Sequence, residues 1–328
     1  MNNVMLLANR DSNSWGFAKK IQSYILETKE ILIPLHEVIF TSFRNGEFGV
    51  HIPENVRKKD VYFIHDSTGN PQEWWVELLL IKDLLLSSSV ESVSFVLPNM
   101  LYSRQDRKDK PHVPISARAL AKSISPGLRR IITMDLHAGQ IQGFYPADVP
   151  VDNLYSFPEV VRYIKKYHFE NLNNLAIVSP DAGAAGRTKA FLNRLEKDQA
   201  DSLNKQIYSF ALLSKERSKP GQVGSMQLIG DVSGKNILIA DDIIDSGGTL
   251  CKAAEILREN GAQKLMCYAT HGIFSSGTEE LIKSFDKVMV SNTHNREYVG
   301  IEKIDVAPLF AEAIYRAQQG FSISRLFC

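Results

Sequence analysis

The residues best suited to chemistry lie in one short segment, residues 239–250, which read IADDIIDSGGTL. An apolar strand pattern over 236–240 leads into acids and small residues, and a helical pattern over 250–260 follows. Backbone N–H groups of the small residues could turn toward one phosphate, aided by hydroxyl groups and by the dipole at the start of the helix. The residues of this cradle are Ser246, Gly247, Gly248 and Thr249. In open α/β sheets, ligands bind at this carboxyl end of a strand.

Three acids precede the cradle. Asp241 and Asp242 could accept hydrogen bonds from vicinal sugar hydroxyls, and Asp245 opens the loop. Two adjacent carboxylates at the end of an apolar strand are costly without a ligand, a metal or a partner. The segment has neither the Gly-x-x-x-x-Gly-Lys-Ser/Thr nor the Gly-x-Gly-x-x-Gly spacing, which disfavours a triphosphate P-loop and a dinucleotide site. A plain tight turn with a helix cap is the alternative interpretation.

A cationic loop, residues 102–110 with the sequence YSRQDRKDK, follows another strand pattern over 92–97. Arg104 is suited to bidentate contacts with polyphosphate oxygens, and Gln105 to the edge of a base or ribose. A solvated basic loop is the alternative that the residues leave open.

Asp135 and His137 end the strand pattern that begins at Arg130. Alternate side chains of an extended backbone point to the same side, so this carboxylate and imidazole could converge on one cation or on a phosphate-bound water. A structural hydrogen bond between them is the alternative. Asp181, in the stretch SPDAGAAGR, could hold a second Mg²⁺ or a ribose hydroxyl, and could equally be a helix N-cap.

Two further loops carry candidate residues. The segment LSKERSKPG, residues 213–221, leaves a strand pattern and is rich in Ser, Pro and Gly, which predicts a mobile loop. Its Lys215 and Arg217 could close over a bound triphosphate, or could simply be solvent-exposed charges. Phe43 follows a strand-like stretch over 37–41 and could lie in a ligand site or in the core.

The elements that must position these residues alternate along the chain, which is typical of an α/β protein with mainly parallel sheets covered on both faces. Strand patterns cover 4–8, 61–65, 92–97, 130–136, 175–179, 207–213, 236–240, 265–270 and 287–291. Helical patterns cover 15–27, 72–86, 116–123, 157–167, 184–196, 250–260 and 307–318.

Bulk properties exclude several classes of protein. The 328 residues suit two domains, and the prolines at 146, 150 and 158 place a boundary near residue 152, giving domains 1–152 and 153–328. The C-terminal tail could pack on the first domain. A formal net charge of +1 argues against nucleic-acid and anionic-membrane partners, and no apolar run is long enough to span a bilayer. Three scattered cysteines and no signal peptide favour a reducing cytoplasm.

The motifs together resemble one family. The string DLHAGQIQGF, residues 135–144, is similar to the DLHxxQIQGF signature of PRPP synthetases, which are ribose-phosphate pyrophosphokinases, and phosphoribosyltransferases do not carry it. The RQD, SPD and DSGGT stretches and the C-terminal residues also match, so the resemblance runs essentially end to end. In the catalytic loop KER stands where the family has KRR, and QEWW at 72–75 replaces the usual Asn-Glu-His. The resemblance implies two tandem phosphoribosyltransferase-like (type I) domains, each with a mainly parallel sheet flanked by helices.

The resemblance also implies an activity: transfer of the β,γ-diphosphoryl group of ATP to the anomeric hydroxyl of ribose 5-phosphate, giving PRPP and AMP. It implies Mg²⁺ as cofactor and a cytoplasmic homo-oligomer built from dimers, up to a hexamer. A phosphoribosyltransferase and a catalytically silent subunit associated with PRPP synthetases are the rival functions. The implied roles are catalysis by Lys215 and Arg217; ATP binding by Phe43, Asn45, Glu47, Arg104, Gln105 and Asp109; ribose 5-phosphate binding by Asp241, Asp242, Asp245, Ser246, Gly247, Gly248 and Thr249; and metal binding by Asp135, His137 and Asp181.

Overall fold

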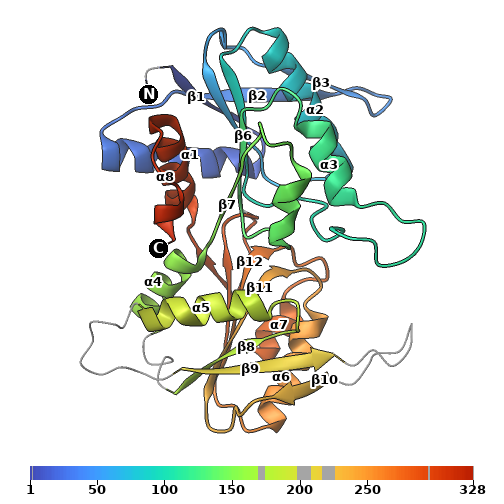
Figure 1. Ribbon diagram of the computed structural model, residues 1–328, viewed down its shortest axis with the longest axis vertical. Helices are drawn as coiled ribbons and strands as arrows, with labels where there is room; N and C mark the ends of the chain where they lie inside the picture. Colours follow the sequence, from blue (N-terminus) through green and yellow to red (C-terminus); the bar gives the residue numbers. More distant parts are fainter. Residues whose placement is uncertain (2, 169–173, 198–207, 216–225, 295, 328) are drawn as a thin grey trace. The chain divides into compact units, whose positions relative to one another are not determined.

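The chain folds into two compact units, each built on its own sheet (Figure 1). The computed structural model describes residues 1, 3–168, 174–197, 208–215, 226–294 and 296–327, with Lys215 described by its backbone alone. Unit 1 comprises Met1–Tyr155, Asn292–Arg296 and Val306–Cys328, and unit 2 comprises Ser156–Ser291 and Glu297–Asp305.

The described part of unit 1 forms a seven-stranded sheet in the order β3-β2-β1-β4-β5-β6-β7. All neighbouring strands are parallel except β2 and β3, which form an antiparallel hairpin. The strands are β1 Val4–Asn9, β2 Leu35–Ser42, β3 Phe48–His51, β4 Asp60–Ile64, β5 Ser92–Leu97, β6 Arg130–Met134 and β7 Val151–Leu154. The helices are α1 Asn13–Lys29, α2 Pro71–Ser87, α3 Ser116–Ile124, α8 Ala307–Gln319 and the short 3₁₀ helices η1 Gly139–Phe144 and η3 Ser324–Leu326.

Alternation along the strands gives unit 1 two cores, one on each face of its sheet. Val4, Leu6 and Ala8 of β1 face α1 and α8, which lie side by side (Figure 1). Met5 and Leu7 face the opposite core, which contains α2 and α3. Because both faces are buried, the strands read as nearly continuous apolar runs. The carboxyl ends of the parallel strands are left as the edge where polar residues can gather.

Unit 2 repeats this architecture, with strand order β10-β9-β8-β11-β12-β13-β14 and one antiparallel pair, β9 with β10. Its strands are β8 Leu175–Ser179, β9 Ser209–Lys215, β10 Met226–Ile229, β11 Asn236–Ile244, β12 Leu265–Gly272, β13 Lys287–Ser291 and β14 Ile301–Ile304. Its helices are α4 Phe157–Tyr167, α5 Ala185–Lys197, α6 Gly248–Glu259 and α7 Glu279–Ser284. Helices α4 and α5 pack on one face of the sheet, and α6 and α7 on the other.

This architecture confirms the predicted α/β class with two tandem, mainly parallel sheets. Two local differences affect the site. Strand β11 continues to Ile244, because its pairing with β12 extends to Gly272, so the acids predicted to follow the strand lie within it. Helix α6 begins at Gly248, two residues earlier than the helical pattern. The strands β3, β7, β10 and β14 were missed, since each is a four-residue edge strand too short to show a period. Among the described residues no helix combines the length and apolar character needed to cross a membrane.

Candidate active site

The acid pair of unit 2 is held by an arginine that sequence reasoning did not single out. Arg187, in the first turn of α5, places Nη1 2.6 Å from Asp242 Oδ1 and 3.6 Å from Asp241 Oδ1. The backbone N–H of Asp242 also donates to Asp241 Oδ1 at 2.9 Å. Asp242 is the more enclosed acid, with 7% of its side chain exposed against 22% for Asp241. The sequence does carry a signal for Arg187. It lies near the start of the helix that follows β8, and β8 is the neighbour of β11, so their carboxyl ends share one edge of the sheet.

Two carboxylates so close together cannot both ionise easily. Burial, and then the charge of Asp242 and its hydrogen bond, raise the pKa of Asp241 to about 8. The Asp242 N–H and the Arg187 guanidinium act in the opposite direction without cancelling this rise. Donors that approach Asp241, such as sugar hydroxyls or a cation, would stabilise its ionised form and lower this raised pKa.

The predicted phosphate cradle has an open helix start. Gly247 is the N-cap of α6 with φ 79°, and no side chain supplies a capping hydrogen bond there. Ser246, Gly248 and Thr249 are exposed. The first N–H groups of a helix lack partners within the helix, so this turn can present them to an anion. Glycine is required at 247, because a Cβ there would lie 2.7 Å from Leu281 Cδ1 in a left-handed backbone conformation.

Asp181 lies in the turn before α5 rather than at the N-cap position, since the helix begins at Ala185. Its Oδ1 accepts a hydrogen bond from the N–H of Ala184 at 3.0 Å, at the turn that leads into α5. The hydroxyl of Ser179 donates to the carbonyl of Asp181 at 2.7 Å and fixes the strand exit. A carboxylate that caps with one oxygen keeps a second oxygen atom, so this contact does not decide whether Asp181 also binds metal.

In unit 1, the cationic loop after β5 is tied to two other elements. The side-chain carbonyl of Gln105 accepts from the Ser116 hydroxyl, and its backbone carbonyl accepts from the N–H of Ala117 at 3.2 Å, so Gln105 is fixed at the start of α3. Gln140 donates to Asp106 at 3.0 Å, joining this loop to the string that follows β6. Arg104 and Asp109 are exposed. The structure thus brings the cationic loop 102–110 and the string 135–144 together at the same edge of the sheet.

The unusual tryptophans at 74 and 75 help to hold this loop. The ring of Trp75 packs edge-on against Tyr102, with 4.9 Å between ring centroids. Its indole N–H donates to the Ser123 hydroxyl at 2.7 Å, which anchors the ring between α2 and α3. Trp74 is buried in the core below. The sequence marked these residues as a departure, and the structure shows what Trp75 contacts.

The geometric argument for Asp135 and His137 was wrong in one respect. Strand β6 ends at Met134, and Asp135 has φ 41°, so the backbone there is left-handed and the alternation of an extended chain does not apply. Asp135 is buried, with 2% exposed, whereas His137 is exposed. Asp135 donates its N–H to the carbonyl of Leu154, which pins the turn to β7.

Phe43, Asn45 and Glu47 lie in the tight turn of the β2–β3 hairpin. The N–H of Phe43 donates to the carbonyl of Glu47 at 2.6 Å, and Asn45 Oδ1 accepts from the Glu47 N–H at 3.2 Å. Phe43 is 56% exposed, so the interpretation of Phe43 as a core residue was wrong. An exposed aromatic ring on a rigid hairpin is suited to stacking on a planar group.

Lys215 is the last residue of β9, where its backbone pairs with Met226 of β10. Arg217, the other predicted catalytic residue, lies outside the described residues. No three His, Cys, Asp or Glu side chains of the described residues gather closely enough to hold a metal ion by themselves. Mg²⁺ commonly takes only one or two protein carboxylates and completes its shell with water and substrate phosphates. The carboxylates of Asp135 and Asp181 therefore fit such an ion.

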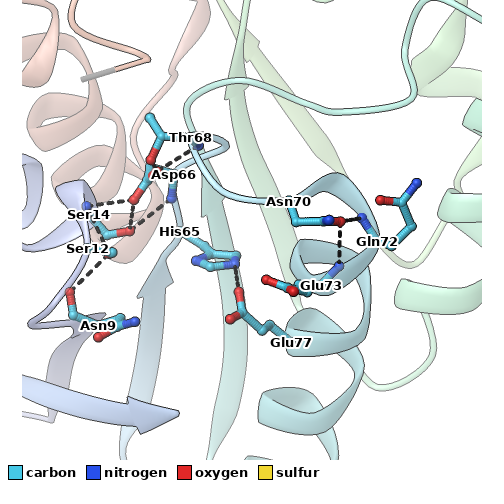
Figure 2. A network of polar contacts seen from close by, with 10 residues as sticks. All are labelled: Asn9, Ser12, Ser14, His65, Asp66, Thr68, Asn70, Gln72, Glu73 and Glu77. Atoms are coloured by element: carbon cyan, nitrogen blue, oxygen red, sulfur yellow. Dashed lines mark hydrogen bonds and ion pairs between the residues drawn. The ribbon is translucent and has the colours of Figure 1, made fainter. Parts of the chain in front are cut away.

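Unit 1 offers an internal comparison for the acid pair. In unit 1 the pairing of β1 with β4 ends at Ala8 and Ile64, and in unit 2 the equivalent pairing of β8 with β11 ends at Val178 and Ile239. Asp66 follows Ile64 by two residues, and Asp241 follows Ile239 by two residues, so the two acids occupy the same register position. Asp66 accepts from backbone N–H and hydroxyl groups of Ser14 and Thr68 (Figure 2). Burial raises its pKa, but these hydrogen bonds outweigh burial and lower the pKa overall. Asp66 of unit 1 thus has a lowered pKa, whereas Asp241 of unit 2 has a raised one.

Comparison with known proteins gives a consistent picture. Residues 6–126 match the model of the N-terminal domain of ribose phosphate pyrophosphokinase, and residues 197–328 match that of the phosphoribosyl synthetase-associated domain. Ribose-phosphate pyrophosphokinase 2 of Saccharomyces cerevisiae is 38% identical over 333 residues, covering 99% of this chain and 98% of the relative. Ribose-phosphate pyrophosphokinase of Rhizobium meliloti is 40% identical over 308 residues, covering 90% of this chain and 93% of the relative.

The fold agrees as well. The crystal structure of phosphoribosylpyrophosphate synthetase from Mycobacterium smegmatis superimposes with a TM-score of 0.83 at 30% identity, covering 97% of this chain and 99% of that one. Since both the sequence and the fold match over nearly the whole length, the chain belongs to the ribose-phosphate pyrophosphokinase family.

Proposed function

We propose that this protein is a ribose-phosphate pyrophosphokinase that converts ATP and ribose 5-phosphate into PRPP and AMP. The observation that carries the proposal is the acid pair of β11, with the raised pKa of Asp241, directly before the start of α6, in a chain with relatives of that name along nearly its whole length. The acid at the same register position in unit 1, Asp66, has instead a lowered pKa.

Unit 2 supplies the binding site for ribose 5-phosphate. The N–H groups and hydroxyls of residues 246–249 bind the 5-phosphate at the start of α6, where the helix dipole favours an anion. Asp241, Asp242 and Asp245 accept hydrogen bonds from the ribose hydroxyls. These bonds favour the charged carboxylates and so offset the repulsion within the pair.

Unit 1 supplies the binding site for ATP, through Arg104, Gln105 and Asp109. The hairpin residues Phe43, Asn45 and Glu47 belong to the same ATP site but come from a second subunit. The resemblance to the family and the exposure of the Phe43 ring support this assignment.

In the transfer step, the anomeric oxygen of ribose 5-phosphate attacks the β-phosphorus of ATP, the bond to the α-phosphate oxygen breaks, and AMP leaves. Lys215 and Arg217 contact the transferred diphosphoryl group and stabilise the charge that spreads over its oxygens. A bound Mg²⁺ would supply positive charge that offsets part of the negative charge of the phosphates. Asp135 and His137 would hold one such ion, and Asp181 would hold a second.

One assay tests the proposal against its rivals. Purified protein is incubated with Mg²⁺, ATP and ribose 5-phosphate, and AMP and PRPP are measured. AMP formation that depends on ribose 5-phosphate supports the proposal. Consumption of PRPP only in the presence of a nucleobase would instead indicate a phosphoribosyltransferase. Inactivity of the chain alone, with stimulation of an active partner, would indicate a regulatory subunit.

We further propose that the enzyme is a cytoplasmic homo-oligomer assembled from dimers. The exposed Phe43 supports an ATP site shared between subunits. Light scattering on the purified protein measures the oligomer directly. A monomer that turns over at full rate at nanomolar concentration would contradict the shared site.

A further inference from the structure

Arg187 joins two acids whose backbone positions direct them apart. Asp241 and Asp242 are consecutive residues of β11, and consecutive side chains of a strand leave on opposite faces. Both nevertheless lie within 3.6 Å of the same atom, Arg187 Nη1. A single guanidinium nitrogen therefore sets the spacing between the two carboxylates at the strand's exposed end.

The contact is well placed to act on a ligand. The Arg187 side chain is 17% exposed, so little water screens its charge from Asp242, which is 7% exposed. Arginine remains charged at any working pH, and its planar group fixes the direction of each N–H. Its positive charge favours the ionised carboxylates, which accept hydrogen bonds from hydroxyl groups more strongly than neutral carboxyl groups do.

We propose that Arg187 is a positioning residue for ribose 5-phosphate: it holds Asp241 and Asp242 at the spacing at which they accept the vicinal hydroxyls of the sugar. This inference rests on the proposed function and deepens it. Arg187 acts through the acids and does not touch the transferred diphosphoryl group. Its loss therefore weakens binding of the sugar phosphate and leaves ATP binding alone.

The first unit carries an acid at the register position of Asp241. Asp66 is held by Ser14 and Thr68, whose donors are all uncharged (Figure 2). An acid at this register position can thus be stabilised without an arginine. Unit 1 has Ser67 where unit 2 has Asp242, so the second acid and its ion pair with Arg187 are particular to unit 2.

The test uses the full-length chain carrying Arg187→Gln, Arg187→Lys or the control Lys189→Gln. Lys189 is an exposed residue of α5 two positions away, and it lies over the Phe210 ring. For Arg187→Gln we expect the KM for ribose 5-phosphate to rise about 10- to 100-fold, the scale of a charged hydrogen bond, with the KM for ATP within about twofold. Arg187→Lys should recover part of the loss, and Lys189→Gln should match wild type.

Isothermal titration calorimetry with ribose 5-phosphate alone separates this inference from the proposed activity. If wild type binds the sugar phosphate without turning over, and Arg187→Gln weakens that binding, the positioning role stands while the proposed activity falls. If wild type neither binds nor turns over, both are overturned. Equal rises in the two KM values, or an unchanged KM for ribose 5-phosphate, would overturn the positioning role alone.

A double-variant cycle covers the case in which Arg187→Gln folds poorly in thermal unfolding. Asp242→Asn and Arg187→Gln are combined, and binding of ribose 5-phosphate is measured for both single variants and the double variant. If Arg187 acts through Asp242, the double variant binds no more than about threefold more weakly than the weaker single variant. Independent, multiplying losses would contradict the inference. The Arg187→Lys variant, which keeps the charge, then provides the kinetic comparison.

Discussion

Asp66→Asn should destabilise unit 1 strongly, because the carboxylate of Asp66 is buried and uses both oxygens. Oδ2 accepts from the N–H of Ser14 at 2.8 Å and from its hydroxyl at 2.6 Å. Oδ1 accepts from the N–H of Thr68 at 2.8 Å and from its hydroxyl. Figure 2 shows these contacts joining the start of α1 to the loop after β4. An amide would set an NH₂ group against one of the two pairs of donors.

The expected magnitude follows from the bonds lost. Two hydrogen bonds to a charged acceptor disappear and two donors become opposed, so the free energy of unfolding should fall by about 3–5 kcal/mol. For a domain of about 150–250 residues, each kcal/mol shifts Tm by about 2–4 °C, which gives a fall of roughly 6–20 °C. Asp11→Asn is the matched control, since Asp11 is an exposed acid in the loop between β1 and α1 and should change stability by about 0.5 kcal/mol or less.

The pH dependence provides a second, independent check. The pKa of Asp66 is lowered from 3.8 in the folded protein, so its contribution to stability is present above pH 3.8 and is lost as the pH falls through the folded pKa. The difference between wild type and Asp66→Asn should therefore shrink in acid, as wild type itself becomes protonated. Urea unfolding of both proteins at pH 7 and in steps below pH 4 measures it. A difference below about 1 kcal/mol at pH 7, or one that grows in acid, would refute the reasoning.

Three further predictions concern unit 2. Lys215→Ala should lower kcat by about 100-fold or more with a much smaller change in KM, because its contact is made mainly in the transition state; near-normal single-turnover rates would contradict this. Gly247→Ala should lower the free energy of unfolding by at least about 1–2 kcal/mol in denaturant unfolding, because the new Cβ would lie 2.7 Å from Leu281 and the backbone has φ +79°. Gly248→Ala is the control and should cost less, because its Cβ would lie 3.9 Å from its nearest neighbour, Ser246 Oγ. The folded pKa of Asp241, about 8, exceeds the ordinary 3.8, so its contribution is complete below pH 3.8 and is lost as the pH rises toward 8. Asp241→Asn should therefore gain stability relative to wild type between pH 6 and 9, and a constant difference across that range would count against the raised pKa.

Local pattern was enough to predict the cradle and the α/β class. The cradle is a strand, a small-residue loop and a helix in direct succession, so its geometry depends on propensities within about a dozen residues. The apolar runs of the buried strands likewise marked the parallel sheets. The edge strands and the true end of β11 were missed, because a strand's length is set by the partner it pairs with, here β12, which lies far along the chain.

The sequence by itself determined which residue types stand at the strand ends, and with the family resemblance it determined the expected activity. Only the tertiary structure decided that Arg187 reaches the acid pair, that Trp75 holds Tyr102, and that Asp135 adopts a left-handed backbone. The physical reason is that such contacts join elements placed by the burial of apolar side chains across a whole sheet. Which polar groups meet at its edge then follows from strand order, and strand order is not written in any local window of residues.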